Sequence, residues 1–242
     1  MHLHPDSQEC TAFVTSSGVY HWTVLPMGVK NGPAMFQAMI SWIIRGLPNV
    51  IVYIDDILVG TAGDVKHPDC LKIHFACLRE LLDVFRKHHL FAKGSKMHLF
   101  KEEIKFCGHI LSKGCRRAAT SKLDAVHKWT QQSIRTVTHL KHFLGLVQYY
   151  AMYLKDFARI ALPLSKKLKA RSPDDKKLVW DKEMVEALNA IKEDLLSNVV
   201  LQLPDPYKSY VLEVDSSDYA VGGVLSQRNA LGELRPVAFF SR

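Results

Sequence analysis

Two adjacent aspartates stand inside an apolar segment, NVIVYIDDILVG (residues 49–60), and this pair constrains the fold more than any other feature. Burying one carboxylate among apolar side chains is costly, and burying two that repel each other costs more. Side chains alternate faces along a strand, so Asp55 and Asp56 can converge only in a tight turn. The pattern therefore predicts a β-hairpin that displays both carboxylates at its tip.

A divalent cation would offset both the repulsion and the desolvation of these carboxylates. Magnesium accepts one or two carboxylates and keeps its other positions for waters and substrate phosphates. Two such ions, roughly 3.5–4 Å apart, stabilise the attacking and leaving oxygens in phosphoryl transfer. A solvent-exposed turn without a metal is the alternative, because aspartate is common in turns.

The rest of the N-terminal half predicts alternating hairpins and helices. Residues 11–25 have the pattern of a β-hairpin with a turn at Ser16–Gly18. A helix that starts at Pro33 would place one apolar face inward, formed by Phe36, Met39/Ile40, Ile43 and Leu47. A long helix after the Asp-Asp hairpin is expected to turn these residues inward: Leu71, Phe75, Leu78, Leu82 and Phe85.

The C-terminal half predicts a strand pair, then helices, then strands. The strand pair is expected around Met97–Phe100 and Ile104–Leu111, and Lys169–Lys177 is the best candidate for a linker. Asp181 caps a helix whose apolar stripe comprises Met184, Leu188, Ile191 and Leu195. Residues 210–240 return to a strand pattern.

The charge of the chain is concentrated in its middle. The 242 residues carry a net charge of +8. Residues 65–171 hold 22 basic and 7 acidic side chains, a sum of +15, whereas residues 1–64 sum to −3 and residues 172–242 to −4. A surface that binds a polyanion would need this distribution, and a solvated lysine-rich helical face would also produce it.

The composition favours an intracellular protein. No stretch reaches 18 uncharged apolar residues, so no membrane span is expected. The five cysteines form no CxxC pair, and the N-terminus lacks the pattern of a signal peptide. We expect a reduced compartment, cytoplasmic or nuclear.

A series of motifs along the chain resembles the reverse transcriptase of gypsy-type LTR retrotransposons. The motifs occur in the order of a Pol polyprotein: LPMGVKNGPAMFQ, VIVYIDDILV, IKFCGHILSKG, FLGLVQYYAMYL, VVLQLPDP and YVLEVDSSDYAVGGVLSQ. This resemblance covers essentially the whole chain. It implies an α+β fold with a partial polymerase palm of antiparallel sheet and helices, a helical thumb and connection, and the start of an RNase H-like α/β domain.

The resemblance also implies roles for single residues. Asp55 and Asp56 in YIDD correspond to the catalytic aspartates that share Mg²⁺ or Mn²⁺ in the family. Nucleotide and template contacts are implied for Tyr53, Met27, Gly28, Phe36 and Gln37. Met27 replaces a glutamine or phenylalanine of some relatives, which leaves its nucleotide contact open. The FCGH segment resembles the primer grip and comprises Phe106, Cys107, Gly108 and His109.

Two further motifs carry implied roles. Asp215 stands where an RNase H-like domain places its first metal-binding aspartate. The segment FLGLVQYY (Phe143–Tyr150) has the pattern of an apolar helix stripe with a glycine that allows close packing. Direct contact of this segment with nucleic acid is the alternative to packing in the core.

The resemblance divides the chain into three parts. Residues 1–115 would be a reverse transcriptase palm, truncated at its N-terminus and without fingers; residues 116–205 the thumb and connection; residues 206–242 the first strands of a truncated RNase H-like domain. The family's third polymerase carboxylate would precede Met1, and the remaining RNase H carboxylates would follow Arg242.

These expectations lead to competing functions. The first is an RNA-directed DNA polymerase that uses two-metal nucleotidyl transfer, with impaired activity in this fragment. Its partners would be an RNA or DNA template–primer duplex, deoxynucleoside triphosphates and other Pol segments. The alternatives are a non-catalytic nucleic-acid-binding remnant of a Pol protein and an inert, poorly folded product.

Overall fold

The chain forms two compact units, Met1–Met97 and His98–Arg242, in a computed structural model. The structure describes residues 1–61, 63, 68–169, 177–197, 199–217 and 220–242. The linker predicted at Lys169–Lys177 falls mostly on residues 170–176, outside the described residues. Within the described ranges, no helix is both long and apolar enough to cross a membrane.

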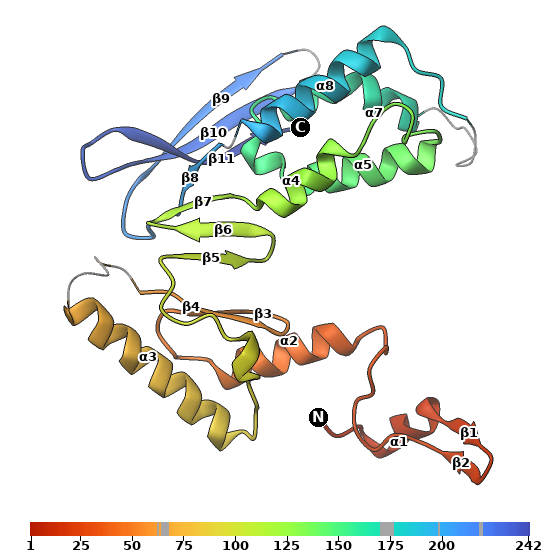
Figure 1. Cartoon of the computed structure of the whole chain (residues 1–242), viewed down its shortest axis with the longest axis vertical. Helices are drawn as coiled ribbons and strands as arrows, with labels where there is room; N and C mark the ends of the chain where they lie inside the picture. The colour runs from red at the N-terminus through yellow and green to blue at the C-terminus, as the bar shows by residue number, and fades with distance from the viewer. Residues whose placement is uncertain (62, 64–67, 170–176, 198, 218–219) are drawn as a thin grey trace. The chain divides into compact units, whose positions relative to one another are not determined.

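In its described residues, the first unit contains two hairpins and two long helices (Figure 1). Its elements are α1 (Pro5–Gln8), η1 (Glu9–Thr11), β1 (Phe13–Thr15), β2 (Gly18–Tyr20), α2 (Gly32–Ile43), β3 (Val50–Tyr53), β4 (Asp56–Val59), α3 (Pro68–Lys87) and η2 (Gly94–Lys96). Strands β1 and β2 form the hairpin predicted within residues 11–25. Pro33 lies in the first turn of α2, where a proline loses no helical hydrogen bond.

The core of the first unit joins α2, α3 and the β3–β4 hairpin. Ile40 and Ile44 from α2 and the turn after it pack against Leu81 and Phe85 of α3. Side chains from both strands border this cluster, namely Val50, Val52, Ile57 and Val59. The apolar face predicted for α2 is therefore confirmed. It packs against one face of the β3–β4 hairpin and against α3.

The inward face predicted for α3 is wrong, because most of the residues predicted to be buried on it are exposed. Leu71, Phe75 and Leu82 are exposed, whereas Cys77 and Leu81 are buried together with the predicted Phe85. Helix α3 carries apolar residues on more than one face, so periodicity alone does not select the buried one. Packing against α2 and β4 makes that choice.

Where the structure describes it, the second unit combines two antiparallel sheets with several helices. Its elements are β5 (Glu103–Phe106), β6 (His109–Ser112), β7 (Cys115–Ala118), α4 (Thr120–His127), α5 (Val137–Tyr149), η3 (Ala151–Tyr153), α6 (Phe157–Ile160), α7 (Leu162–Lys169), α8 (Lys182–Leu196), β8 (Leu201–Gln202), β9 (Tyr210–Ser216), β10 (Val221–Arg228) and β11 (Leu234–Ser241). The sheet orders are β5-β6-β7-β8 and β11-β10-β9.

The strand predicted at Met97–Phe100 is absent from the structure. The pair lies instead within residues 103–112, where β5 and β6 join through a two-residue turn at Cys107 and Gly108. Met97 follows a single turn of 3-10 helix, and Phe100 has a left-handed backbone with φ of 54°. Both features interrupt an extended chain.

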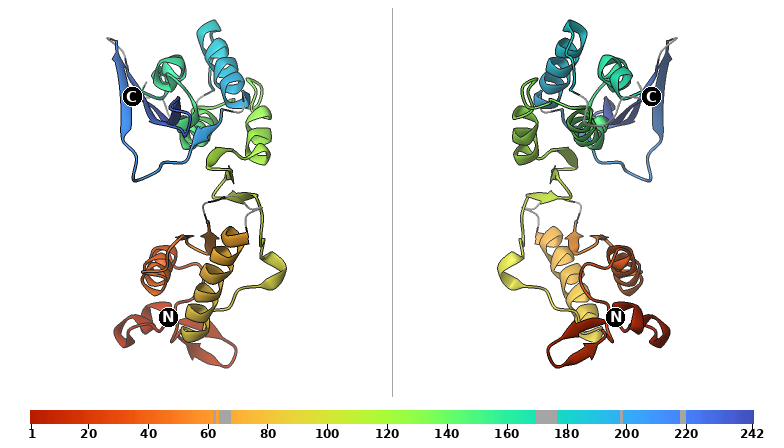
Figure 2. Two further views of the ribbon diagram at one scale, coloured as in Figure 1. Left: turned by 90° about the vertical axis from the view of Figure 1, so that its left-hand side faces the viewer. Right: turned by 90° about the vertical axis from the view of Figure 1, so that its right-hand side faces the viewer.

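The core of the second unit lies among its helices. Leu140, Phe143 and Val147 of α5 are buried. The stripe predicted for α8 is confirmed, since Met184, Leu188, Ile191 and Leu195 are all buried. Asp181 caps that helix, because its carboxylate accepts a hydrogen bond from the Met184 N–H at 2.9 Å. Figure 2 shows the helices of this unit on one side of the β9–β10–β11 sheet.

The predicted α+β class is confirmed, because helices accompany sheets whose described strand pairs are all antiparallel. The three-part division at residues 115 and 205 stays a prediction. The two compact units divide the chain at a different point, between Met97 and His98.

Candidate functional site

The two adjacent aspartates occupy the tip of the β3–β4 hairpin, as the sequence predicts. Tyr53 pairs with Asp56 across the strands, and Ile54 and Asp55 form the two-residue loop between them. Asp55 and Asp56 are exposed, and 57% of Tyr53 is exposed. The charges therefore lie at the solvent end of the hairpin, while Val52 and Ile57 reach the core.

The backbone of the hairpin tip is strained. Ile54 has φ of 55°, the left-handed region, which is an outlier for a β-branched residue. Such conformations persist where the surrounding structure holds them in place, and they cluster at functional sites. Contacts from other parts of the unit are therefore expected to hold this loop in its strained conformation.

Gln37 of α2 fixes the loop through hydrogen bonds. The Ile54 N–H donates to the Gln37 side-chain oxygen. The Gln37 amide nitrogen donates to Ser41 Oγ at 2.8 Å and lies 3.4 Å from the Val52 carbonyl. The resemblance implies a template or nucleotide contact for Gln37, whereas the structure places its amide against the strained turn.

The other residues implied for nucleotide contact lie in different surroundings. Met27 is fully exposed, and Gly28 has φ of 87°, which a glycine adopts without a Cβ penalty. Phe36 is half-buried and packs on the core cluster of Ile40, Leu81 and Phe85. Tyr53 and Met27 are thus exposed to solvent, whereas Phe36 packs on the core that the hairpin shares.

The chemistry of the hairpin tip is that of two neighbouring carboxylates. Within the described residues, no three His, Cys, Asp or Glu side chains are grouped so that they could hold an ion. Asp55 and Asp56 provide two adjacent carboxylates at an exposed position. This donor set fits magnesium bound by one or two carboxylates together with phosphates and waters.

The segment that resembles the primer grip forms the tip of a second hairpin. Phe106 pairs with His109, and the loop residues Cys107 and Gly108 have φ of 46° and 76°. Positive φ at both central positions is what a type I′ turn requires. Three tyrosines that contact this turn are not among the residues predicted from the sequence, and their clustering in the segment YYAMY (residues 149–153) is the signal that indicates them.

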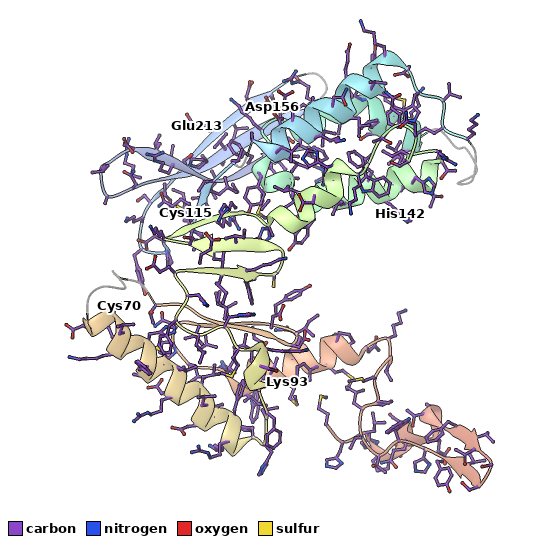
Figure 3. The ribbon with its side chains drawn as sticks, viewed as in Figure 1. Cys70, Lys93, Cys115, His142, Asp156 and Glu213 are labelled. Atoms are coloured by element: carbon purple, nitrogen blue, oxygen red, sulfur yellow. The ribbon has the colours of Figure 1, made fainter. Side chains whose placement is uncertain are left out.

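Asp215 lies on β9, opposite Gly222 of β10, and is exposed. Its carboxylate accepts a hydrogen bond from the Ser216 N–H at 2.9 Å. Together with Asp156, which Figure 3 labels, it borders a shallow hollow. Arg159 also lines this hollow and lies 3.7 Å from the Asp156 carboxylate. The structure thus brings together Asp55 with Asp56, and groups Phe106 through His109 in one turn, while Asp215 lies on a separate sheet.

Two protein-family models match this chain. Residues 1–111 match the family described as reverse transcriptase (RNA-dependent DNA polymerase). Residues 180–242 match the family described as an RNase H-like domain found in reverse transcriptase.

Curated relatives match nearly the whole chain. The chain is 31% identical to the retrovirus-related Pol polyprotein from transposon opus of Drosophila melanogaster, covering 100% of this chain and 24% of the relative. It is 32% identical to the Pol polyprotein from transposon 297 of the same species, covering 99% of this chain and 21% of the relative. The chain therefore spans roughly a quarter of the length of these relatives.

Solved structures share the fold over the whole chain. A foamy viral protease-reverse transcriptase in complex with double-stranded DNA superposes with a TM-score of 0.84 at 24% identity, covering 40% of that chain. The foamy viral protease-reverse transcriptase in complex with an RNA/DNA hybrid gives 0.79 at 26% identity, covering 31% of that chain.

Proposed function

Because the chain contains reverse transcriptase and RNase H-like domains of the kind found in transposon Pol polyproteins, we propose that it belongs to an RNA-directed DNA polymerase. The proposed reaction joins the 3′-hydroxyl of a primer to the α-phosphate of a deoxynucleoside triphosphate and releases pyrophosphate. The order of the motifs supports a narrower proposal, that the element of origin is a gypsy-type LTR retrotransposon.

The main support for this proposal is the arrangement of the two carboxylates at the β3–β4 hairpin tip. Asp55 and Asp56 are exposed together at the end of a hairpin that the core and Gln37 hold in place. These two residues would hold Mg²⁺ or Mn²⁺. Once bound, a divalent cation would neutralise negative charge that develops on the reacting oxygens.

Other exposed residues would position the substrates. Met27 and Gly28 are exposed in a segment where the glycine backbone can approach a ligand closely, and Tyr53 adjoins the carboxylates. We assign these three residues to nucleotide contact. The turn at Cys107 and Gly108 is assigned to the primer, and residues 116–205 to the thumb and connection that hold the duplex.

The Mg²⁺-dependent stabilisation of a ternary complex tests this proposal. The chain is bound to a primer–template duplex. The lifetime of this complex is measured with the next complementary deoxynucleotide, with a mismatched one, and with none. We expect the complementary nucleotide to prolong the lifetime only when Mg²⁺ is present. Asp55→Asn and Asp56→Asn should abolish that effect, whereas Asp83→Asn, which removes an equal charge from α3, should not. Equal lifetimes with all three nucleotide conditions would contradict the proposal.

The charge distribution favours a second candidate function, a non-catalytic nucleic-acid-binding remnant. Residues 65–171 carry a net charge of +15. Binding through phosphates releases counterions, so affinity for a duplex should fall steeply as salt increases and should not depend on Mg²⁺. Salt-dependent binding without any nucleotide effect would select this candidate over a polymerase.

Asp215 receives a separate assignment. We propose that it is the first metal-binding residue of the RNase H-like region, supported by its exposed place on β9. The hollow that it shares with Asp156 is the place where a cation would contact it.

A further inference from the structure

Three tyrosine hydroxyls hold three consecutive residues at the tip of the β5–β6 hairpin. Tyr149 donates to the Cys107 carbonyl, and Tyr150 lies 3.2 Å from the Gly108 carbonyl. The Tyr153 hydroxyl lies 2.9 Å from Nδ1 of His109. These tyrosines come from the end of α5 and from η3, about forty positions along the chain from the turn.

Ring contacts reinforce the hydrogen bonds. The His109 ring stacks on Tyr149, with centroids 5.4 Å apart and planes inclined by 14°. It also meets Tyr150 edge-on at 5.9 Å. A Cβ at Gly108 would lie 3.1 Å from the Tyr150 hydroxyl, so the tyrosines fit closely only around a glycine.

The tyrosines differ in exposure. Tyr150 and Tyr153 are buried, with 1% and 3% of their surfaces exposed, so packing alone accounts for them. Tyr149 is 50% exposed and yet binds the carbonyl of Cys107, a non-glycine residue in the left-handed region. A hydroxyl bound to that carbonyl fixes the orientation of the Cys107–Gly108 peptide.

We propose that Tyr149 is a positioning residue for the primer: its hydroxyl holds the Cys107–Gly108 turn in the orientation that recognises a recessed 3′ end. This inference rests on the proposed function, which assigns the turn to the primer. It predicts that removing one oxygen atom changes recognition of the strand end while general duplex binding persists.

The test compares two labelled duplexes of equal length and overhang, one with a recessed 3′ end and one with a recessed 5′ end. Their affinities for the full chain are measured by fluorescence anisotropy at fixed salt. We expect the unmodified chain to prefer the recessed 3′ end. In Tyr149→Phe, which keeps the stacked ring, the preference should fall about fivefold, the effect of one hydrogen bond. Tyr207→Phe is the matched control, because Tyr207 is 97% exposed and remote in sequence.

A rescue variant separates positioning from simple loss of stability. Cys107→Asn creates Asn-Gly, the pair most favourable for a type I′ turn. Added to Tyr149→Phe, it should restore the preference for the 3′ end. It also supports the turn if Tyr149→Phe alone fails to fold.

The outcomes are distinguishable. A chain that prefers the 3′ end and keeps that preference in Tyr149→Phe overturns the inference and leaves the proposed function standing. Equal binding of both duplexes by the unmodified chain also overturns the inference. Failure to bind either duplex contradicts the proposed function itself.

Discussion

At the scale of single residues, Gln37 shows how one side chain of a helix can hold the backbone of a neighbouring turn. The left-handed backbone of Ile54 costs roughly 1–2 kcal/mol for an L-residue. Gln37 offsets part of that cost, because its side-chain oxygen accepts the Ile54 N–H. The geometry of Asp55 and Asp56 therefore depends on a residue outside the YIDD motif.

Replacing Gln37 with methionine should weaken the first unit. Methionine preserves the length of the side chain but leaves the Ile54 N–H without its protein partner, a loss of about 1 kcal/mol at a partly exposed position. We expect lower stability in urea unfolding and faster hydrogen exchange at Ile54. Gln131→Met on the exposed surface is the control, and an equal response in both variants would refute this role for Gln37.

His109 illustrates an electrostatic effect within the tyrosine cluster. Burial lowers the pKa of His109, and the nearby Arg116 guanidinium lowers it further. Burial raises the pKa of Tyr153 to about 12, so its hydroxyl stays protonated and can donate to the neutral imidazole.

The lowered pKa of His109 predicts how stability depends on pH. The unfolded chain binds this proton more readily than the native chain, so the contribution of His109 is complete above about pH 6.5. It is lost as the pH falls from 6.5 toward the native pKa. The difference in unfolding free energy between the unmodified chain and His109→Gln should therefore shrink on acidification, and a difference that grows would contradict this account.

At the scale of elements, the sequence predicted those structures whose signals are local. The hairpin tip at Asp55–Asp56, the start of α2 at Pro33 and the cap of α8 at Asp181 all follow from neighbouring residues. The buried face of α3 did not, because packing against other elements selects among its apolar faces. The left-handed Ile54 was also missed, since it depends on Gln37, 17 positions earlier.

The glycine around which side chains pack closely also differs between the prediction and the structure. The sequence predicts close helix packing at Gly145, but a Cβ there would meet no described atom within 4 Å apart from the neighbouring backbone of its own helix. Close packing occurs instead at Gly108, between Tyr149 and Tyr150.

The two glycines therefore predict opposite effects of alanine. Gly108→Ala should destabilise the second unit by about 1–2 kcal/mol or more, because φ of 76° is unfavourable for alanine and its Cβ crowds Tyr150. Gly145→Ala should stabilise it by about 0.5–1 kcal/mol, since alanine favours the interior of α5. Thermal unfolding of the two variants measures both values, and effects of the same sign would refute this assignment.

At the scale of the whole molecule, a hairpin with paired carboxylates and a turn held by tyrosines support the proposed polymerase. The middle segment, with a net charge of +15, fits both that function and non-catalytic binding of nucleic acid. The order of motifs in the sequence predicted the reverse transcriptase and RNase H-like regions that the family models match. The residues that hold the hairpin and the turn in place became visible only in the structure, because their contacts join distant parts of each unit.

The central proposal is that Asp55 and Asp56 form a cation site, separate from the one assigned to Asp215. Manganese is paramagnetic and substitutes for magnesium, so titrating Mn²⁺ into the ¹⁵N-labelled chain should broaden the amide signals of residues 53–57 first. Asp55→Asn should remove that selective broadening, and Asp83→Asn should preserve it. Broadening that begins elsewhere, or that persists unchanged in Asp55→Asn, would contradict the account.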